Sequence, residues 1–227
     1  MKKLVIGILS VMLVFAMGCS GKKAVPQNPE IILNISGFAE WEQNISDPKV
    51  LRELVDAVVI ARISKIEGGN NYNPLEKVYT LITTIGQMED KQVIAGDLKP
   101  GTLPFIRDGG MISAFEYEKG LQDEDPAKKT LAKMSTEEKK NKYVKDFLND
   151  DIELEAGKTY LCYIAYNKDY QRYSIGGYQY GTREYDEKTN TFKNNETGEW
   201  EKLDFEKLWA KEELPPPDAT KEETPKS

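Results

Sequence analysis

The sequence AVVIARISKIEG, residues 57–68, decides the fold class. A short run rich in Val and Ile and bounded by turn residues is typical of a buried β-strand. Residues 68–71, GGNN, follow it and predict a turn that ends this strand. Residues 77–88, KVYTLITTIGQM, alternate in character and predict the next strand. Two neighbouring strands therefore form the centre of the predicted domain.

The segments on either side predict a helix and a further strand. Asp47 and Pro48 form a helix start, with Asp47 as the cap and Pro48 at the first helical position. After a Pro-Gly turn, residues 102–108, TLPFIRD, predict a strand that ends at two glycines. Pro104 lacks a backbone N–H, so we expect this strand at a sheet edge or at a bulge.

The C-terminal half is rich in β-strand patterns and interrupted by one charged segment. Residues 120–150 carry dense charge and the capping-box spacing of Ser135 and Glu138, which predicts a surface insertion with a helix through about Leu148. The other predicted elements are a short strand at 111–118, strands at 159–166, 171–186 and 191–200, and a helix at 203–214.

We therefore predict a mainly β (α+β) protein with one globular domain at 31–214 and a disordered tail at 215–227. Five or more strands spaced by short turns suggest a small antiparallel OB-like barrel with a short N-terminal helix, the charged helical insertion and a C-terminal helix. The order of the segments DAVVIARISKIEG, YTLITTIGQM, GDLKPGTLPFIRDGG and AGKTYLCYI, followed by RYSIGGYQYG, resembles a group of Gram-positive surface lipoproteins with such barrels. The resemblance spans residues 47–185 and implies no activity, because that group has none assigned.

The composition argues against several classes of partner and catalytic site. The chain has 227 residues, a formal net charge of −7 and no histidine. An acidic chain without a basic block repels phosphate backbones, so we expect no nucleic-acid partner. The absence of histidine excludes Ser-His-Asp and Cys-His catalysis and HExxH zinc sites.

The N-terminus has the order of a bacterial lipoprotein signal. A basic start precedes the apolar residues 4–17, which are too few to span a bilayer and fit a signal-peptide core. Ala16-Met17-Gly18-Cys19 resembles the bacterial lipobox. The resemblance implies cleavage after residue 18, a diacylglycerol and palmitate on Cys19, and an extracytoplasmic protein anchored to the cell membrane. The alternative is a plain secretory signal cleaved elsewhere, with Cys19 incidental.

Residues 19–30 form the predicted tether, because Ser20 to Pro29 are small and polar, with two prolines. The second cysteine, Cys162, lies within a predicted strand and has no disulfide partner once Cys19 is lipidated. We expect Cys162 to be a buried free thiol.

Tyrosines between glycines mark the candidate ligand-binding surface. Exposed aromatic rings on a barrel face stack on sugars or peptides, which makes Tyr173, Tyr178, Tyr180 and Arg183 the candidate ligand-binding residues. The alternative is that these tyrosines pack on the barrel and that the arginine is a surface charge.

The acidic clusters at 123–125 and 150–153 lack the alternating ligands and glycine of a calcium loop, so we expect solvated surface, no metal and no cofactor. No motif supports a catalytic residue. The sequence thus favours a lipid-anchored extracytoplasmic binding module whose partners are the membrane, through Cys19, and a cell-wall glycan, a peptide or an envelope protein. Two alternatives remain: a carboxylate-based cell-envelope hydrolase, and an accessory or inhibitor subunit of an envelope enzyme.

Overall fold

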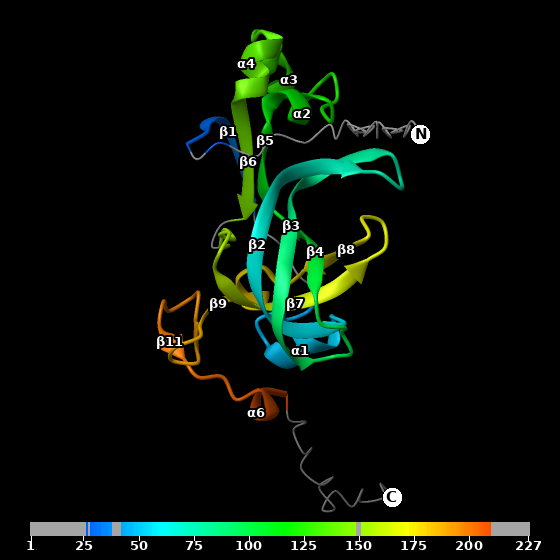
Figure 1. Cartoon of the computed structure of the whole chain (residues 1–227). Helices are drawn as coiled ribbons and strands as arrows, with labels where there is room; N and C mark the ends of the chain where they lie inside the picture. The colour runs from blue at the N-terminus through cyan, green and yellow to red at the C-terminus, as the bar shows by residue number, and fades with distance from the viewer. Residues whose placement is uncertain (1–25, 27, 38–41, 149–150, 210–227) are drawn as a thin grey trace, which may run out of the picture.

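A computed structural model of the chain describes residues 26, 28–37, 42–148 and 151–209 (Figure 1). The predicted signal peptide (1–18), Cys19, most of the tether and the tail at 215–227 lie outside the described residues, so these assignments stay predictions. Among the described residues, no helix combines the length and the apolar character that crossing a bilayer requires.

The protein is mainly β, as predicted. The strands are β1 (Glu30–Gly37), β2 (Ala57–Asn73), β3 (Val78–Ala95), β4 (Thr102–Asp108), β5 (Gly110–Ser113), β6 (Lys142–Leu148), β7 (Thr159–Asn167), β8 (Arg172–Ile175), β9 (Thr182–Asp186), β10 (Thr191–Lys193) and β11 (Trp200–Glu201). The helices are α1 (Pro48–Glu53), α2 (Ala114–Glu118), α3 (Pro126–Leu131), α4 (Thr136–Asn141), α5 (Tyr178–Gly181) and α6 (Phe205–Trp209).

Eight strands form a large mixed sheet in the order β11-β10-β9-β7-β2-β3-β4-β8. β8 also pairs with β7, so the pairings among β7, β2, β3, β4 and β8 return to their starting strand. The β4–β8 pairing is parallel, whereas the neighbouring pairings are antiparallel. This corrects the prediction of a purely antiparallel sheet. The chain leaves the sheet after β4, returns as β7 and then turns into β8, and a long connection of this kind permits the parallel pairing of β8 with β4.

The predicted turn at residues 68–71 is wrong, because β2 continues through the glycines to Asn73. Gly68 has φ +130°, and the register with β3 shifts between Ile66 and Gly68, so the glycines bend the strand without ending it. A Cβ on Gly69 would lie 2.2 Å from the carbonyl oxygen of Met111, the second residue of β5. Gly69 therefore permits the backbone of β5 to lie directly on β2.

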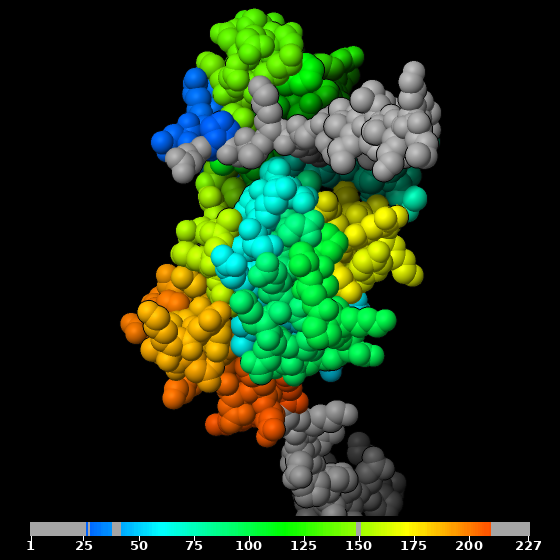
Figure 2. All heavy atoms as spheres, viewed as in Figure 1, coloured from blue at the N-terminus to red at the C-terminus, as the bar shows by residue number. Residues whose placement is uncertain are grey.

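A second sheet joins β1, β5 and the charged segment's β6 in the order β1-β6-β5, with β1 parallel and β5 antiparallel to β6. Its core corrects the prediction of a purely surface insertion, since Val144 is 0% and Leu131 is 2% exposed. The helix predicted through Leu148 ends at Asn141, where β6 begins. The strand predicted at 111–118 ends at Ser113 and continues as α2. We call this sheet with α2, α3 and α4 the second lobe; it lies at one end of the molecule, opposite α6 (Figures 1 and 2).

Both faces of the large sheet are buried at the start of β2. Val59, Ala61 and Ile63 point to one core cluster, while Val58 and Ile60 point to another that includes residues of α1, β10 and α6. This full burial explains the near-continuous apolar run that begins the strand. Cys162 is a free thiol with 0% exposure, which confirms its prediction.

The structure confirms the predicted cap of α1 and corrects the predicted edge position of β4. The Asp47 carboxylate accepts the backbone N–H of Lys49 at 2.8 Å and caps α1. β4 is not an edge strand, because it pairs with β3 on one side and β8 on the other. Pro104 lies outside the short pairing with β8, which covers residues 105 and 106. The missing N–H of Pro104 therefore costs no hydrogen bond to β8.

Candidate functional site

Several cavities meet at the end of β4. Arg107 lines three of them, with volumes of about 130, 240 and 270 Å³. The two larger ones, which we call the deep cavity (240 Å³) and the groove (270 Å³), also share Asp108, Ser174, Ile175 and Gly176. The candidate site is therefore the surface around the end of β4 and the adjoining β8.

A buried ion pair fixes the position of Arg107. Its Nη2 donates to Asp151 Oδ1 at 2.6 Å, and the two side chains are 3% and 2% exposed. Asp151 belongs to the acidic cluster that the sequence placed in solvent, and its burial corrects that prediction. Among the described residues, Arg107 Nε and Asp151 Oδ2 have no hydrogen-bond partner. Such a pair contributes little net stability, but the loss of either partner would leave a buried charge uncompensated.

A second polar contact lies beside this pair. The Tyr178 hydroxyl donates to Asp108 Oδ2 at 2.9 Å. Burial, followed by the negative charge of Asp108, raises the pKa of Tyr178 well above its usual range. The phenol therefore stays protonated and acts as a hydrogen-bond donor. Gly177 and Tyr178 have φ +78° and +45°, so the chain turns tightly at the wall of the deep cavity.

The deep cavity is mostly apolar. Its wall contains Leu51 and Leu54 of the α1 region, Val55, Ala165 of β7 and Ile175 of β8. Its polar groups are Arg107, Asp108, Ser174 and Tyr178. An apolar cavity with a few convergent polar groups is the usual form of a small-molecule or side-chain pocket.

The groove has a different lining, which is rich in hydroxyl and amide groups. It contains Thr80 and Leu81 of β3, Ile106 of β4, and Asn167, Tyr170 and Ser174 of the β7–β8 hairpin. The hydroxyls of Thr80 and Tyr170 lie 3.4 Å apart, and Asn167 Nδ2 donates to Ser174 Oγ at 3.3 Å. Leu81 is 74% exposed, more than any other large apolar side chain in the described residues. The groove thus offers an apolar lip beside hydrogen-bonding groups.

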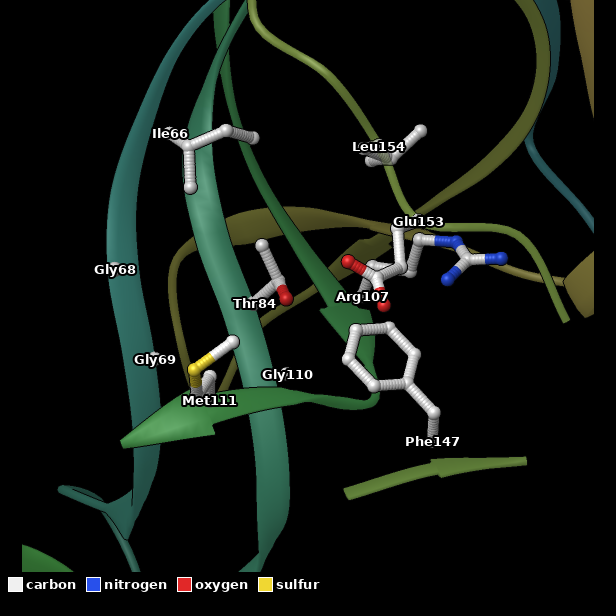
Figure 3. A pocket seen from close by; sticks show the side chains of 10 residues that line it. All are labelled: Ile66, Gly68, Gly69, Thr84, Arg107, Gly110, Met111, Phe147, Glu153 and Leu154. Carbon is white, nitrogen blue, oxygen red and sulfur yellow. The ribbon is translucent and has the colours of Figure 1, made fainter. Parts of the chain in front are cut away.

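The third cavity lies at the seam between the large sheet and the second lobe (Figure 3). Gly68, Gly69 and the adjoining Thr84 of β3 lie on one side with Met111, and Phe147 and Glu153 lie across from them (Figure 3). Figure 3 shows the Arg107 guanidinium pointing away from the Gly69 wall. Glu153 forms an ion pair with Lys145, so its charge is already compensated.

The structure separates the four ligand-binding residues predicted from the sequence. Tyr173 packs against the core cluster of Val59, and its ring lies edge-on at 5.3 Å from that of Tyr166. Tyr180 packs against the other cluster, and its hydroxyl donates to Glu196 at 3.2 Å. Arg183 pairs with Glu201 at 2.6 Å. Of the four, Tyr178 lines a cavity. All three tyrosines are half-buried, and the binding roles stay predictions.

The groups that meet at the site escaped the sequence analysis. Arg107 and Asp108 precede two glycines, and from the sequence this RDGG stretch predicts only the end of a strand. A charged pair immediately after a buried strand, before glycines that turn the chain, was the available signal. Thr80 and Tyr170 belong to two hairpins 90 residues apart, and no local pattern joins them.

Comparisons with known proteins leave the site to be judged on its chemistry alone. No protein-family model matches the chain, and no curated protein or solved structure matches it. Among the described residues, no group of three or more acidic or cysteine side chains could hold a metal ion.

Proposed function

We propose that the chain is a lipid-anchored extracytoplasmic binding module, attached to the cell membrane through Cys19, that holds an extended ligand in the groove. The order of the N-terminal sequence, from basic start to lipobox-like Ala16-Met17-Gly18-Cys19, supports the anchor. The groove supports the binding role. The ligand class that fits it best is a cell-wall glycan.

The domain that carries the groove is, in this proposal, an OB-like barrel. Five strands pair in the cycle β2-β3-β4-β8-β7 and back to β2, with β4 and β8 parallel. OB-folds bind oligosaccharides and oligonucleotides on the face of their second and third strands, between two hairpin loops. The corresponding face here is β3 and β4, with the loops at 73–78 and 167–172. The groove lies on that face.

The chemistry of the groove carries the choice of ligand. Thr80, Asn167, Tyr170 and Ser174 supply hydroxyl and amide groups that exchange hydrogen bonds with sugar hydroxyls. Leu81 offers an apolar surface for the carbon face of a sugar ring. The Arg107–Asp151 pair is neutral, and Asp108 adds one negative charge beside it. This balance disfavours polyanions such as nucleic acids.

The same cavities weigh against the alternative of a carboxylate-based hydrolase. Such an enzyme needs two carboxylates facing the same cavity. Among the described residues, the deep cavity and the groove each have one, Asp108, and the third cavity has one, Glu153. Asp151 is occupied by Arg107. The accessory or inhibitor role stays a prediction, which no feature of the site favours.

Co-sedimentation with purified peptidoglycan sacculi tests the proposal. The chain from Ser20 onward, which retains every described residue, should sediment with sacculi. Leu81→Asp should weaken this binding about tenfold, equivalent to about 1.4 kcal/mol, because it places a charge on the lip of the groove. Tyr170→Phe should weaken it less, since it removes one hydroxyl.

Trp200→Asp is the matched control. Trp200 is 45% exposed in β11 and lines none of the three cavities, so its variant should bind as the wild type does. Equal binding by Leu81→Asp and the wild type would refute the groove as the binding surface. Absence of wild-type binding to sacculi would refute the glycan.

A further inference from the structure

The tip of the β2–β3 hairpin exposes an apolar surface that the groove does not use. We call Tyr72, Leu75, Val78 and Tyr79 the hairpin patch; their exposures are 36%, 65%, 45% and 42%. All residues from 74 to 81 are exposed. Tyr72 and Tyr79 share one face of the hairpin, Val78 lies on the other face and Leu75 lies in the turn. Large apolar side chains exposed all round a hairpin tip are unusual in a protein surrounded only by water and mark a contact surface.

The hairpin patch is held in shape by its own hydrogen bonds. Asn73 Oδ1 accepts the backbone N–H groups of Leu75 and Glu76 at 3.0 and 3.1 Å. Tyr72 and Tyr79 are cross-strand partners whose ring centroids are 5.2 Å apart. The turn and the Tyr72–Tyr79 pair are therefore ordered, and this order lowers the entropic cost of binding.

A chain of contacts joins the patch to the point where the tether enters the fold. A Cβ on Gly120 would lie 2.8 Å from Tyr79 Cβ, so the turn after α2 packs on the hairpin. Glu118 of α2 pairs with Lys139 of α4 at 2.6 Å. Lys142, just after α4, pairs with Glu30, the first residue of β1, at 2.9 Å. Figure 1 shows β1, α4, α2 and the hairpin gathered at the same end, opposite α6.

The predicted tether is short. Ten residues lie between Cys19 and Glu30. A chain of that length spans at most about 40 Å when fully extended, and about 20 Å on average when flexible. A lipid on Cys19 would therefore keep this end of the molecule at the bilayer surface.

The charges at the tip do not oppose such contact. Glu76 and Lys77 at the turn balance each other, as do Lys168 and Asp169 in the facing β7–β8 hairpin. The net negative charge of the whole chain is thus not concentrated at this tip. Tyrosine with Leu and Val is the composition that favours the boundary between lipid headgroups and acyl chains.

We propose that the hairpin patch inserts into the headgroup boundary of the bilayer that carries the lipid on Cys19. The lipid and the patch are then two membrane contacts, and together they fix the orientation of the domain. This inference rests on the lipid anchor of the proposed function, but not on the identity of the groove's ligand.

The test uses the full chain, lipidated in cells and reconstituted in vesicles of phosphatidylcholine and phosphatidylglycerol. Leu75→Cys carries an environment-sensitive NBD label, with Trp200→Cys as the control position at the opposite end. Labelling is selective because Cys19 is acylated, whereas Cys162 is fully buried and burial raises its thiol pKa to about 12. Flotation of the vesicles reports the anchor, and the label reports the patch.

We expect the label at residue 75 to show a blue-shifted, severalfold brighter emission on vesicles and to be quenched by lipids that carry a quencher near the headgroup. The label at residue 200 should remain in water. Protein that does not float overturns both the anchor and this orientation. Protein that floats with an aqueous label at residue 75 overturns the orientation alone. A blue shift that instead grows with protein concentration without lipid assigns the patch to a second copy of the chain and also overturns the proposal.

Discussion

The large sheet and the second lobe reach their stability by different routes. β2 and β3 are consecutive antiparallel strands of 17 and 18 residues. The first five residues of β2, which pair with β7, are buried on both faces. In the second lobe, β1 pairs in parallel with β6, more than 100 residues later in the chain. Its buried core is small, and Ile82 of the large sheet contributes to it. The comparison indicates that the large sheet folds as the scaffold and that the second lobe depends on it.

The largest expected effect comes from the interior of the large sheet. Phe105 of β4 is 0% exposed. Phe105→Ala should lower the free energy of unfolding by about 4 kcal/mol, because it removes a buried ring and leaves a cavity. Denaturant titration should show one cooperative transition at a lower midpoint. Unfolding of the large sheet with the second lobe still folded would contradict the dependence of the lobe on the scaffold.

The next effect concerns the bridge between the two regions. Arg107 lies in β4, and Asp151 follows β6 of the second lobe. Arg107→Met should lower the free energy of unfolding by about 3 kcal/mol. This value is at the lower end of the range for breaking a buried ion pair, because the neighbouring cavities can admit water to Asp151. Denaturant titration of the single variants and of Arg107→Met with Asp151→Leu forms a double-mutant cycle. The double variant should recover most of the loss, and strictly additive losses would show that the pair does not couple the regions.

A close backbone approach joins the same two regions at Gly69. Gly69→Ala should cost about 2 kcal/mol, because the new Cβ would overlap the Met111 carbonyl and the side chain of Ile112. Hydrogen exchange should show faster opening of β5 than of β7. Gly176→Ala is the control, since a Cβ there meets no atom within 4 Å. Equal losses for both variants would mean that crowding at the seam is not the cause.

A smaller, local effect is expected at the capping box of α4. The Ser135 hydroxyl accepts the backbone N–H of Glu138, whose carboxylate accepts the Ser135 N–H at 2.8 Å. Ser135→Ala should lower the stability of α4 by about 1 kcal/mol. The loss should appear as faster amide exchange in α4, with the protection of β2 and β7 unchanged. Faster exchange throughout β2 would show that α4 is part of the scaffold.

The smallest effect is pH-dependent and belongs to the second lobe. Burial, followed by the charge of Asp108, raises the pKa of Asp146 in β6 above its usual 3.8. A raised carboxyl pKa contributes stability that is present below the unfolded value and is lost as the pH rises through the folded value. Asp146→Asn should therefore raise the melting temperature slightly at pH 7, and this gain should disappear below pH 3.8. A gain that persists in acid would exclude Asp146 as its origin.

The prediction of the fold succeeded where the pattern is local. The apolar run at 57–68, the cap at Asp47 and the buried Cys162 each carry their own signal, because burial on both faces and helix capping depend on near neighbours. It failed at residues 68–71, where glycines usually mark a turn. There Gly69 is needed because the backbone of Met111, more than 40 residues later in the chain, packs against it. No pattern in the local sequence indicates that contact.

The candidate site also depends on contacts between distant segments, which local sequence patterns do not predict. The density of tyrosines predicts Tyr173, Tyr178, Tyr180 and Arg183 as one ligand-binding surface. In the fold, Tyr173 and Tyr180 pack on different core clusters, Tyr178 lines the deep cavity and Arg183 pairs with Glu201. The groove arises because the β2–β3 and β7–β8 hairpins converge, which brings Thr80 and Tyr170 together. Composition can report that aromatic side chains are abundant, but convergence depends on strand order.

The sequence by itself determined the mainly β class, the first helix, the central strands and the free thiol. These depend on residue preferences and on contacts between near neighbours in the chain. Only the tertiary structure decided the parallel pairings, the second lobe, the burial of Arg107 with Asp151 and the groove. Each of these joins segments tens of residues apart, and their meeting depends on the packing of the whole chain, which no short stretch of sequence specifies.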